Sequence, residues 1–169
     1  TTSDDFLIVT YTPEGELFSE DGLARLGALR DELQGLEAVG STNSILNVPL
    51  LHSPDLTLDT VDSEIKTLDD HDVTPDTARQ ALLNNPLYPN LLISEDGRTT
   101  AIQVNLPTPD RYFELLRKRN DLRDKADAGE ASEAELAELE RVKQDFIDFT
   151  ETLGVERDAT IRTVRSILD

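Results

Sequence analysis

The stretch that decides the fold runs from residue 84 to residue 106 and reads NNPLYPNLLISEDGRTTAIQVNL. Asp96-Gly97 is a residue pair that readily adopts the positive φ angles of a tight turn. Before this turn Leu91 and Ile93 fall on one face of an incoming strand, and after it apolar and polar residues alternate as far as Leu106. The pattern predicts a β-hairpin with one buried face, whose strands lie near 90–95 and 99–106.

The N-terminal part predicts a strand, a helix and a second strand. The run FLIVTY at 6–11 is continuously apolar or β-branched, which is typical of a strand covered on both faces. Ser19 can cap a helix at 20–35, in which leucines recur at spacings of three and four. A second strand is expected near 40–47. Strand, helix and strand in this order predict a parallel crossover, and therefore a small mixed sheet covered on one face by the helix.

Residues 49–73 form an acidic segment without a clean apolar period, and we interpret them as an irregular, lid-like excursion. Thr74 followed by Pro75 predicts the start of a short helix that ends at Asn84-Asn85-Pro86. The fold class is therefore α+β, with an α/β layer at 1–107.

The rest of the chain predicts a long antiparallel helical hairpin at 108–153. Thr108-Pro109-Asp110 repeats the helix start seen at Thr74, Gly129 breaks the run, and Ser132 to Glu135 is a capping box. Gly154 is expected to end the second helix, and a further helix is expected at 158–169. Together these parts make one domain, 1–169. The second helix of the hairpin carries an apolar stripe at Leu136, Leu139, Val142, Phe146 and Phe149.

The composition excludes several classes of partner. With 35 acidic against 16 basic residues and a net charge of −19, the chain is unsuited to nucleic acid and to direct adhesion on anionic lipid. The absence of cysteine excludes a disulfide framework and thiol chemistry. No run approaches the ~18 apolar residues that span a bilayer. The polar first residues contain no signal peptide, and the absence of methionine leads us to expect a piece of a longer chain.

The candidate chemical residues predict neither an enzyme nor a metal or cofactor site. Carboxylates are so abundant that no acid–base pair stands out. The cluster at 69–72 could bind a divalent ion, but it lacks the spacing of a calcium loop, and a solvated acidic loop is the simpler interpretation. Ser41 and Ser94 are interpreted as strand or turn residues, and Tyr88 and Tyr112 as packing residues. The residues of this candidate metal cluster are Asp69, Asp70, His71 and Asp72. The other histidine of the chain is His52.

The stretch 84–106 resembles the first extracytoplasmic loop of RND superfamily transporters, in the branch of predicted exporters related to the MMPL proteins. The opening DDFLIVTYTPEGELFSEDGLARLGALRDELQGLEAVGSTNSILNVPLL and the closing ATIRTVRSILD resemble the two ends of the same loop. The agreement is looser at 53–73 and 125–145. The positions that carry the resemblance, which we expect to be structural, are Asn85, Pro86, Leu87, Tyr88, Asn90, Asp96, Gly97, Arg98, Thr99 and Thr100.

The resemblance implies a ferredoxin-like, porter-type layer in a proton-driven exporter of lipids or of other hydrophobic or amphiphilic compounds. It places the chain on the periplasmic side of a bacterial inner membrane. Its partners would be the transporter's membrane helices and second periplasmic loop, and a homo-oligomer is possible. Proton relay carboxylates would lie in the membrane helices, so none is assigned here. A sheet edge is expected to stay open for a neighbouring element.

A second hypothesis is a free-standing periplasmic binding or adaptor module that acts through the helical hairpin. The reading frame distinguishes the two hypotheses, because only the transporter requires hydrophobic helices before Thr1 and after Asp169.

Overall fold

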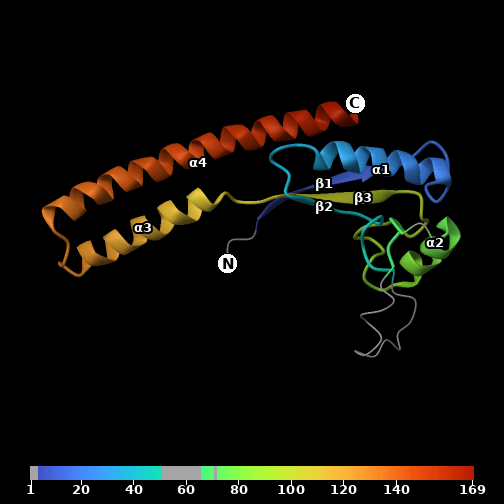
Figure 1. Cartoon of the computed structure of the whole chain (residues 1–169), viewed down its shortest axis with the longest axis horizontal. Helices are drawn as coiled ribbons and strands as arrows, with labels where there is room; N and C mark the ends of the chain where they lie inside the picture. The colour runs from blue at the N-terminus through green and yellow to red at the C-terminus, as the bar shows by residue number, and fades with distance from the viewer. Residues whose placement is uncertain (1–3, 51–65, 71) are drawn as a thin grey trace. The chain divides into compact units, whose positions relative to one another are not determined.

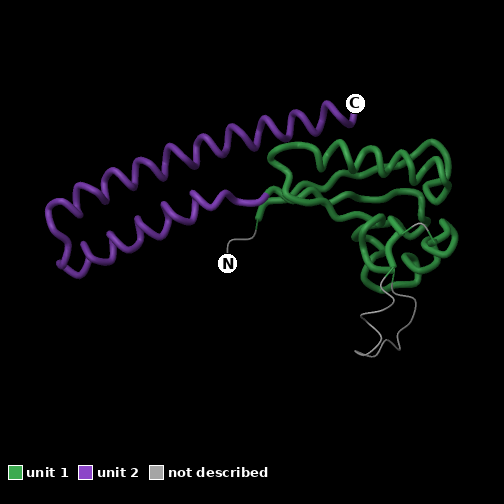
Figure 2. The backbone as a smooth tube through the Cα atoms, viewed as in Figure 1, with its two compact units in different colours: residues 1–106 green, residues 107–169 purple. Residues whose placement is uncertain are grey.

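The computed structural model describes residues 4–50, 66–70 and 72–169 of the chain. Their fold is α+β, as the sequence predicts (Figure 1). The chain divides into unit 1, residues 1–106, and unit 2, residues 107–169 (Figure 2). In chain order the elements are β1 (Asp5–Tyr11), α1 (Glu20–Gln34), β2 (Ser41–Asn43), α2 (Pro75–Asn84), β3 (Thr100–Leu106), α3 (Asp110–Asp127) and α4 (Glu133–Leu168).

The sheet of unit 1 is antiparallel, with the strand order β1-β3-β2. Strands β1 and β2 run parallel to each other, but β3 lies between them and pairs with both. The prediction of a mixed sheet is therefore wrong, although the two strands of the predicted crossover do run parallel. Its physical reason is burial: Ile102 and Val104 of β3 are fully buried, and a strand this apolar takes the central position.

Helix α1 covers one face of this sheet, as the sequence predicts (Figure 1). Ser19 caps the helix by accepting a hydrogen bond from the Gly22 amide at 3.0 Å. Leu26 and Leu33 of α1 are fully buried, as are Ile102 and Val104 of β3. These leucines and strand residues form the core of unit 1.

The opposite face of the sheet is exposed on β1. Side chains alternate along a strand, so Val9 is buried whereas Phe6 and Ile8 are 56% and 54% exposed. The prediction that both faces of 6–11 are covered is wrong within the described residues. The apolar run alone does not distinguish a two-sided strand from one with apolar residues on an open face.

Strand β2 is much shorter than the predicted 40–47. After Asn43 the backbone turns: the Asn47 side chain accepts from the Ser44 amide and donates to the Thr42 carbonyl, both at 2.8 Å. The Ser44 hydroxyl also accepts from the Leu46 amide. Such local side-chain bonds compete with strand pairing and end the strand early.

The predicted incoming strand at 90–95 is not a strand. The Tyr88 carbonyl accepts from the amides of Leu91 and Leu92, at 3.1 and 3.0 Å, and Asn90 adopts a positive φ of 66°. The segment is therefore a turn, in which Ile93 makes isolated bridges to Pro89 and Thr100. Ile93 is buried as predicted, but Leu91 is 71% exposed.

The helix starts are local features, and most agree with the sequence. Thr74 caps α2 by accepting from the Thr77 amide at 3.3 Å. Ser132 caps α4 by accepting from the Glu135 amide at 3.1 Å. Helix α3 differs, since Pro109 holds the cap position without a side-chain hydrogen bond, so the predicted cap at Thr108 is wrong.

Helix α4 continues through Gly154 to Leu168, so the predicted end at Gly154 and the separate helix at 158–169 are wrong. One glycine in a helix interior costs only about 1 kcal/mol, which a long helix tolerates. Gly129 does end the first helical run: it follows α3 with a φ of 73°. Near the middle of α4, Arg157 donates to the Pro107 carbonyl at 2.9 Å and ties the helix to the start of unit 2.

Helices α3 and α4 pack as a hairpin (Figure 2). Leu122 of α3 meets Leu139 and Val142 of α4 in a small buried cluster, with Ala126 against it. Leu136 is 45% exposed and does not belong to the buried stripe, contrary to the sequence prediction. In the described part of the chain, no helix has both the length and the apolar composition required to cross a bilayer.

Candidate functional site

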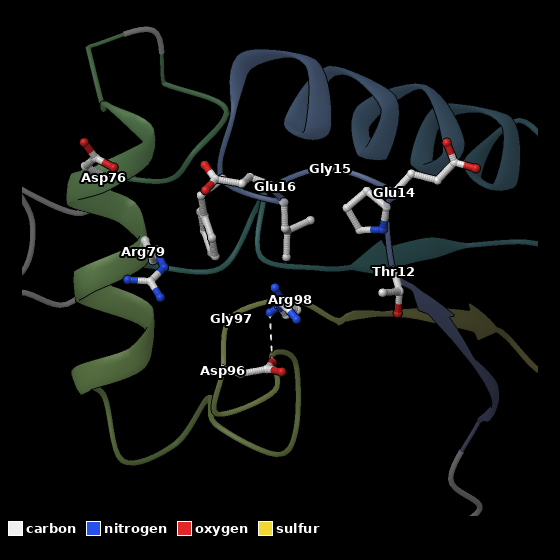
Figure 3. A pocket seen from close by; sticks show the side chains of 12 residues that line it. Thr12, Glu14, Gly15, Glu16, Asp76, Arg79, Asp96, Gly97 and Arg98 are labelled. Carbon is white, nitrogen blue, oxygen red and sulfur yellow. Dashed lines mark hydrogen bonds between the residues drawn. The ribbon is translucent and has the colours of Figure 1, made fainter.

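Unit 1 contains a surface cavity of about 750 Å³. Three segments that are far apart in the sequence line it: the loop from Thr12 to Phe18 after β1, helix α2, and the turn from Asp96 to Arg98 (Figure 3). The last of these is part of the stretch that resembles the transporter loop. The cavity therefore connects the sequence signal to a three-dimensional feature.

The turn at 94–99 is held by its own side chains. The Gly97 amide donates to the Ser94 carbonyl at 2.9 Å, and the Asp96 carboxylate accepts from the Ser94 hydroxyl at 2.6 Å and from the Arg98 amide at 3.0 Å. These hydrogen bonds, with that from Ser94 the strongest, hold the pKa of Asp96 below its usual value. Gly97 has a φ of 70°, as the sequence predicts for this turn, whereas Asp96 keeps a negative φ.

Arg79 of α2 lies over Gly97. A Cβ atom added to Gly97 would be 3.3 Å from Arg79 Nε and 3.7 Å from Leu83 Cδ1. The positive φ of 70° favours glycine at this position, and a larger residue would also have to displace the Arg79 side chain slightly. Arg79 and Arg98 reach the cavity from α2 and from the turn (Figure 3), and neither has an ion-pair partner among the described residues.

The loop after β1 forms the remaining wall and is anchored at both ends. The hydroxyls of Thr12 and Thr99 are 2.8 Å apart, which joins the loop to the turn. At its other end Leu17 and Phe18 are buried, and the Ser19 hydroxyl donates to the Glu16 carbonyl at 2.8 Å. A fixed loop on one side and a closed turn on the other give the cavity a defined shape.

The lining is polar rather than apolar. Four carboxylates and two guanidinium groups face or border the cavity, while Pro13, Leu17 and Phe18 provide limited apolar surface. Such a lining suits a polar or zwitterionic molecule, because each charge on the ligand would find an opposite charge nearby. The described lining contains no histidine, serine or cysteine that could act as a nucleophile or base. The charged residues are Glu14, Glu16, Asp76, Arg79, Asp96 and Arg98.

The positions that carry the resemblance to the transporter loop occupy two structural settings. Asp96, Gly97 and Arg98 border the cavity. The positions at 85–90 form the turn that precedes Asp96 in the chain. The buried Asn85 side chain accepts a hydrogen bond from the Leu87 amide at 2.8 Å across Pro86, and the Leu87 side chain is exposed. Thr99 bonds to Thr12, and the buried Thr100 hydroxyl donates to the Leu92 carbonyl at 2.7 Å.

Tyr88 ties this turn to the start of the acidic segment. Its hydroxyl donates to the Pro49 carbonyl at 2.8 Å, and burial raises the pKa of the phenol above its usual value. On the other side of the segment, the Arg30 guanidinium donates to both oxygens of Asp69, at 2.9 and 2.7 Å. Burial of Arg30 lowers its pKa, but the carboxylates of Asp69 and Asp31 outweigh it, and the net pKa is raised.

The carboxylates of the candidate metal cluster at 69–72 each have a different partner. Asp69 pairs with Arg30, Asp70 accepts from the Thr67 amide at 2.7 Å, and Asp72 pairs with Lys66. Its remaining member His71, like His52 and most of the excursion, lies outside the described residues. Among the residues described, no group of three potential ligands converges on one point.

Sequence reasoning missed most of the cavity's charged residues. Glu14 follows the first strand among turn residues, and neither Glu16 nor Arg79 belongs to any motif of the sequence. Their convergence depends on how α2 packs against the turn at 96–98, which no local pattern encodes. The one available signal was Gly97, whose positive φ allows a neighbouring side chain to approach.

Comparison of the chain with protein-family models, with curated proteins and with solved structures finds no match.

Proposed function

We propose that this chain is a periplasmic domain of a proton-driven exporter of the RND superfamily, in the branch related to the MMPL proteins. In this role it forms part of the path for lipids or other hydrophobic or amphiphilic compounds. It works together with the membrane helices and the second periplasmic loop of the same transporter. The proposal rests on the resemblance of 84–106 and of the two ends of the chain, and on the sheet.

The observation that carries the proposal is the incomplete sheet. Strands β1 and β2 run parallel with β3 antiparallel between them, and α1 lies on one face. This split β-α-β arrangement supports a ferredoxin-like layer, in which it would supply three of the four strands and one of the two helices. A further strand beside β1 would extend such a layer, and within the described part of the chain no second strand pairs with β1 on that side.

The exposed face of β1 beside that edge also supports the proposal that the sheet is incomplete. Phe6 and Ile8 are both more than half exposed on β1, next to its unpaired edge. An open edge with large apolar side chains is a liability for an isolated domain, and proteins normally cover it. We infer that the intact transporter supplies one element that pairs with the edge of β1 and another that packs on its open face and buries these two side chains.

The cavity beside Gly97 has a separate place in this proposal. Its charged lining offers little apolar surface for a lipid-like substrate. We therefore assign the hydrophobic substrate path to other surfaces of the assembled transporter, and regard the cavity as a polar contact region of the domain.

The first test is the reading frame. Hydrophobic segments long enough to span a bilayer should precede Thr1 and follow Asp169 in the gene. A gene that encodes neither segment would contradict the proposal and favour the free-standing module.

The second test uses the lack of cysteine in this chain, which makes single-cysteine labelling clean. In Ile8→Cys, maleimide labelling should be fast in the isolated chain and at least about tenfold slower in the full-length protein in membranes, because the element that packs on the open face of β1 excludes the reagent. Glu32→Cys, at an exposed position of α1, is the control for general access. Equal labelling of Ile8→Cys in both preparations would refute the covered face.

The alternative, a binding or adaptor module, has one observation of its own. The hairpin exposes Leu136 and Ile147 on α4, at 45% and 48%. A partner helix could use them as anchors. The reading frame decides between the two proposals.

A further inference from the structure

A second candidate site lies in unit 2, apart from the sheet on which the proposed function rests. Arg119 and Arg123 of α3, with Lys143, Phe146 and Ile147 of α4, line a hollow of about 300 Å³. We refer to these five residues as the basic hollow. It lies between the two helices of the hairpin, whose course Figure 2 shows.

The charge of the basic hollow is opposite to that of the chain. Residues 1–106 hold 19 acidic and five basic residues, whereas 107–169 hold 16 acidic and 11 basic residues. Five of these bases fall within the nine residues 117–125. The lining has three cationic side chains and no carboxylate. In a chain with a net charge of −19, this is a local positive potential that attracts an anion.

The two arginines are not neutralised by a carboxylate, and Arg119 is also held in position by its neighbours. They are four residues apart on one helix, so they lie on the same face. The Arg119 guanidinium lies 4.7 Å from the centroid of the Phe146 ring and contacts the Asn120 amide oxygen at 3.2 Å. Neither Arg119 nor Arg123 has a carboxylate partner among the described residues.

The other three residues complete the surroundings of the hollow. Lys143 pairs with Glu140 at 3.2 Å, but the lysine is 44% and the glutamate 75% exposed, so the pair is weak and opens at little cost. Phe146 provides an aromatic face, and Ile147 is 48% exposed. Cationic donors thus lie beside a small apolar surface.

We propose that the basic hollow binds a small organic phosphate, a phosphomonoester that carries an aromatic or short aliphatic group. Guanidinium groups match the oxygens of phosphate in pairs, and a phosphomonoester carries about −1.5 to −2 charges at pH 7. The charge of a phosphomonoester therefore matches three cationic side chains better than the single charge of a carboxylate does. The organic group lies on Phe146 and Ile147, and its contact adds affinity that inorganic phosphate lacks.

Phenyl phosphate is the probe, used with the full chain in a buffer of low ionic strength that contains no phosphate. Backbone amide NMR shifts should move in a saturable way and should be confined to the neighbourhood of the basic hollow. Inorganic phosphate should bind more weakly at the same residues, and benzyl alcohol should not bind. The dissociation constant should rise with added salt, because the contacts are largely electrostatic.

The variant R119Q/R123Q should weaken phenyl phosphate binding by at least about tenfold, since it removes both guanidinium forks. R162Q/R165Q is the matched control: it removes the same charge from two exposed positions of α4 and should bind like the parent chain. Ile147→Ala should weaken phenyl phosphate binding and leave inorganic phosphate unchanged, because this exposed side chain is not among the contacts that position Arg119.

Circular dichroism of each variant should show the helix content of the parent. Three results would overturn the proposal: no saturable binding of phenyl phosphate, equal loss of binding in R162Q/R165Q, or retained binding in R119Q/R123Q. Equal affinity for inorganic phosphate would overturn the role of the apolar surface.

Discussion

Two glycines of helix α1 should respond in opposite directions to the same substitution. A Cβ atom at Gly22 would lie 2.3 Å from the Glu16 carbonyl oxygen and 2.6 Å from that of Leu17. At Gly27 nothing lies within 4 Å of such an atom. The chemical change and the helix are the same, so the difference between the two variants measures the packing of the loop against the first turn.

The magnitudes follow from known costs. Removing a glycine from an open helix position stabilises by up to about 1 kcal/mol, which is the expectation for Gly27→Ala. Overpacking costs about 1–3 kcal/mol, and at Gly22 the obstructing atoms are backbone carbonyls that cannot rotate away. Ser19 fixes one of them by donating to the Glu16 carbonyl at 2.8 Å. We expect a net loss of about 2 kcal/mol for Gly22→Ala, and therefore about 3 kcal/mol between the variants.

Native-state hydrogen exchange read by mass spectrometry measures both effects on α1 peptides. Exchange limited by opening of unit 1 should be about 30-fold faster in Gly22→Ala and about threefold to fivefold slower in Gly27→Ala. Peptides from α3 serve as the internal reference for labelling conditions. Slower or unchanged exchange in Gly22→Ala would show that the loop before α1 yields, and the packing argument would be wrong.

Three further changes test other parts of the chain. Gly154→Ala should stabilise unit 2 by about 0.5–1 kcal/mol, whereas Gly129→Ala, at a φ of 73°, should destabilise it by about 1 kcal/mol. Urea unfolding measures both changes. If both substitutions changed the free energy of unfolding in the same direction, the continuous helix would be contradicted. Ser94→Ala should raise the pKa of Asp96 toward its usual value in a carboxyl NMR titration. Because the folded pKa of Asp96 is lowered, its contribution to stability is complete above the unfolded pKa of about 3.9 and is lost as the pH falls through the folded value. Tyr88→Phe should lower the free energy of unfolding by about 1 kcal/mol, because it removes the hydrogen bond to the Pro49 carbonyl. In the parent chain the pKa of Tyr88 should lie above its usual value of about 10 in an absorbance titration. Because the folded pKa is raised, the contribution of Tyr88 to stability is lost as the pH rises through that folded pKa.

The features that sequence reasoning predicted well are local ones. Ser19, Thr74 and Ser132 cap helices because a hydroxyl reaches an amide three residues ahead, whatever the rest of the chain does. Gly97 takes a positive φ for a similarly local reason. The buried face of β3 also follows from its own alternation of apolar and polar residues.

The features that sequence reasoning missed depend on competition between local and distant contacts. The run at 90–95 has the composition of a strand, but the Tyr88 carbonyl captures the Leu91 and Leu92 amides and turns the chain. The strand order follows from the burial of β3, which only the assembled sheet decides. Gly154 looked like a helix end because its propensity is poor, yet neighbouring residues continued the helix. Arg79 reaches the cavity through the packing of α2, which no sequence pattern indicates.

The continuity of α4 has a mechanical consequence. With 36 residues against 18 in α3, this helix is about 54 Å long and its partner about 27 Å, so a large part of it extends past the hairpin contact. An uninterrupted helix acts as a stiff lever: a tilt of about 10° at one end displaces the other by about 9 Å over this length. A hinge at Gly154 would have absorbed such a tilt, whereas the continuous helix carries a movement of the hairpin tip to its C-terminal end.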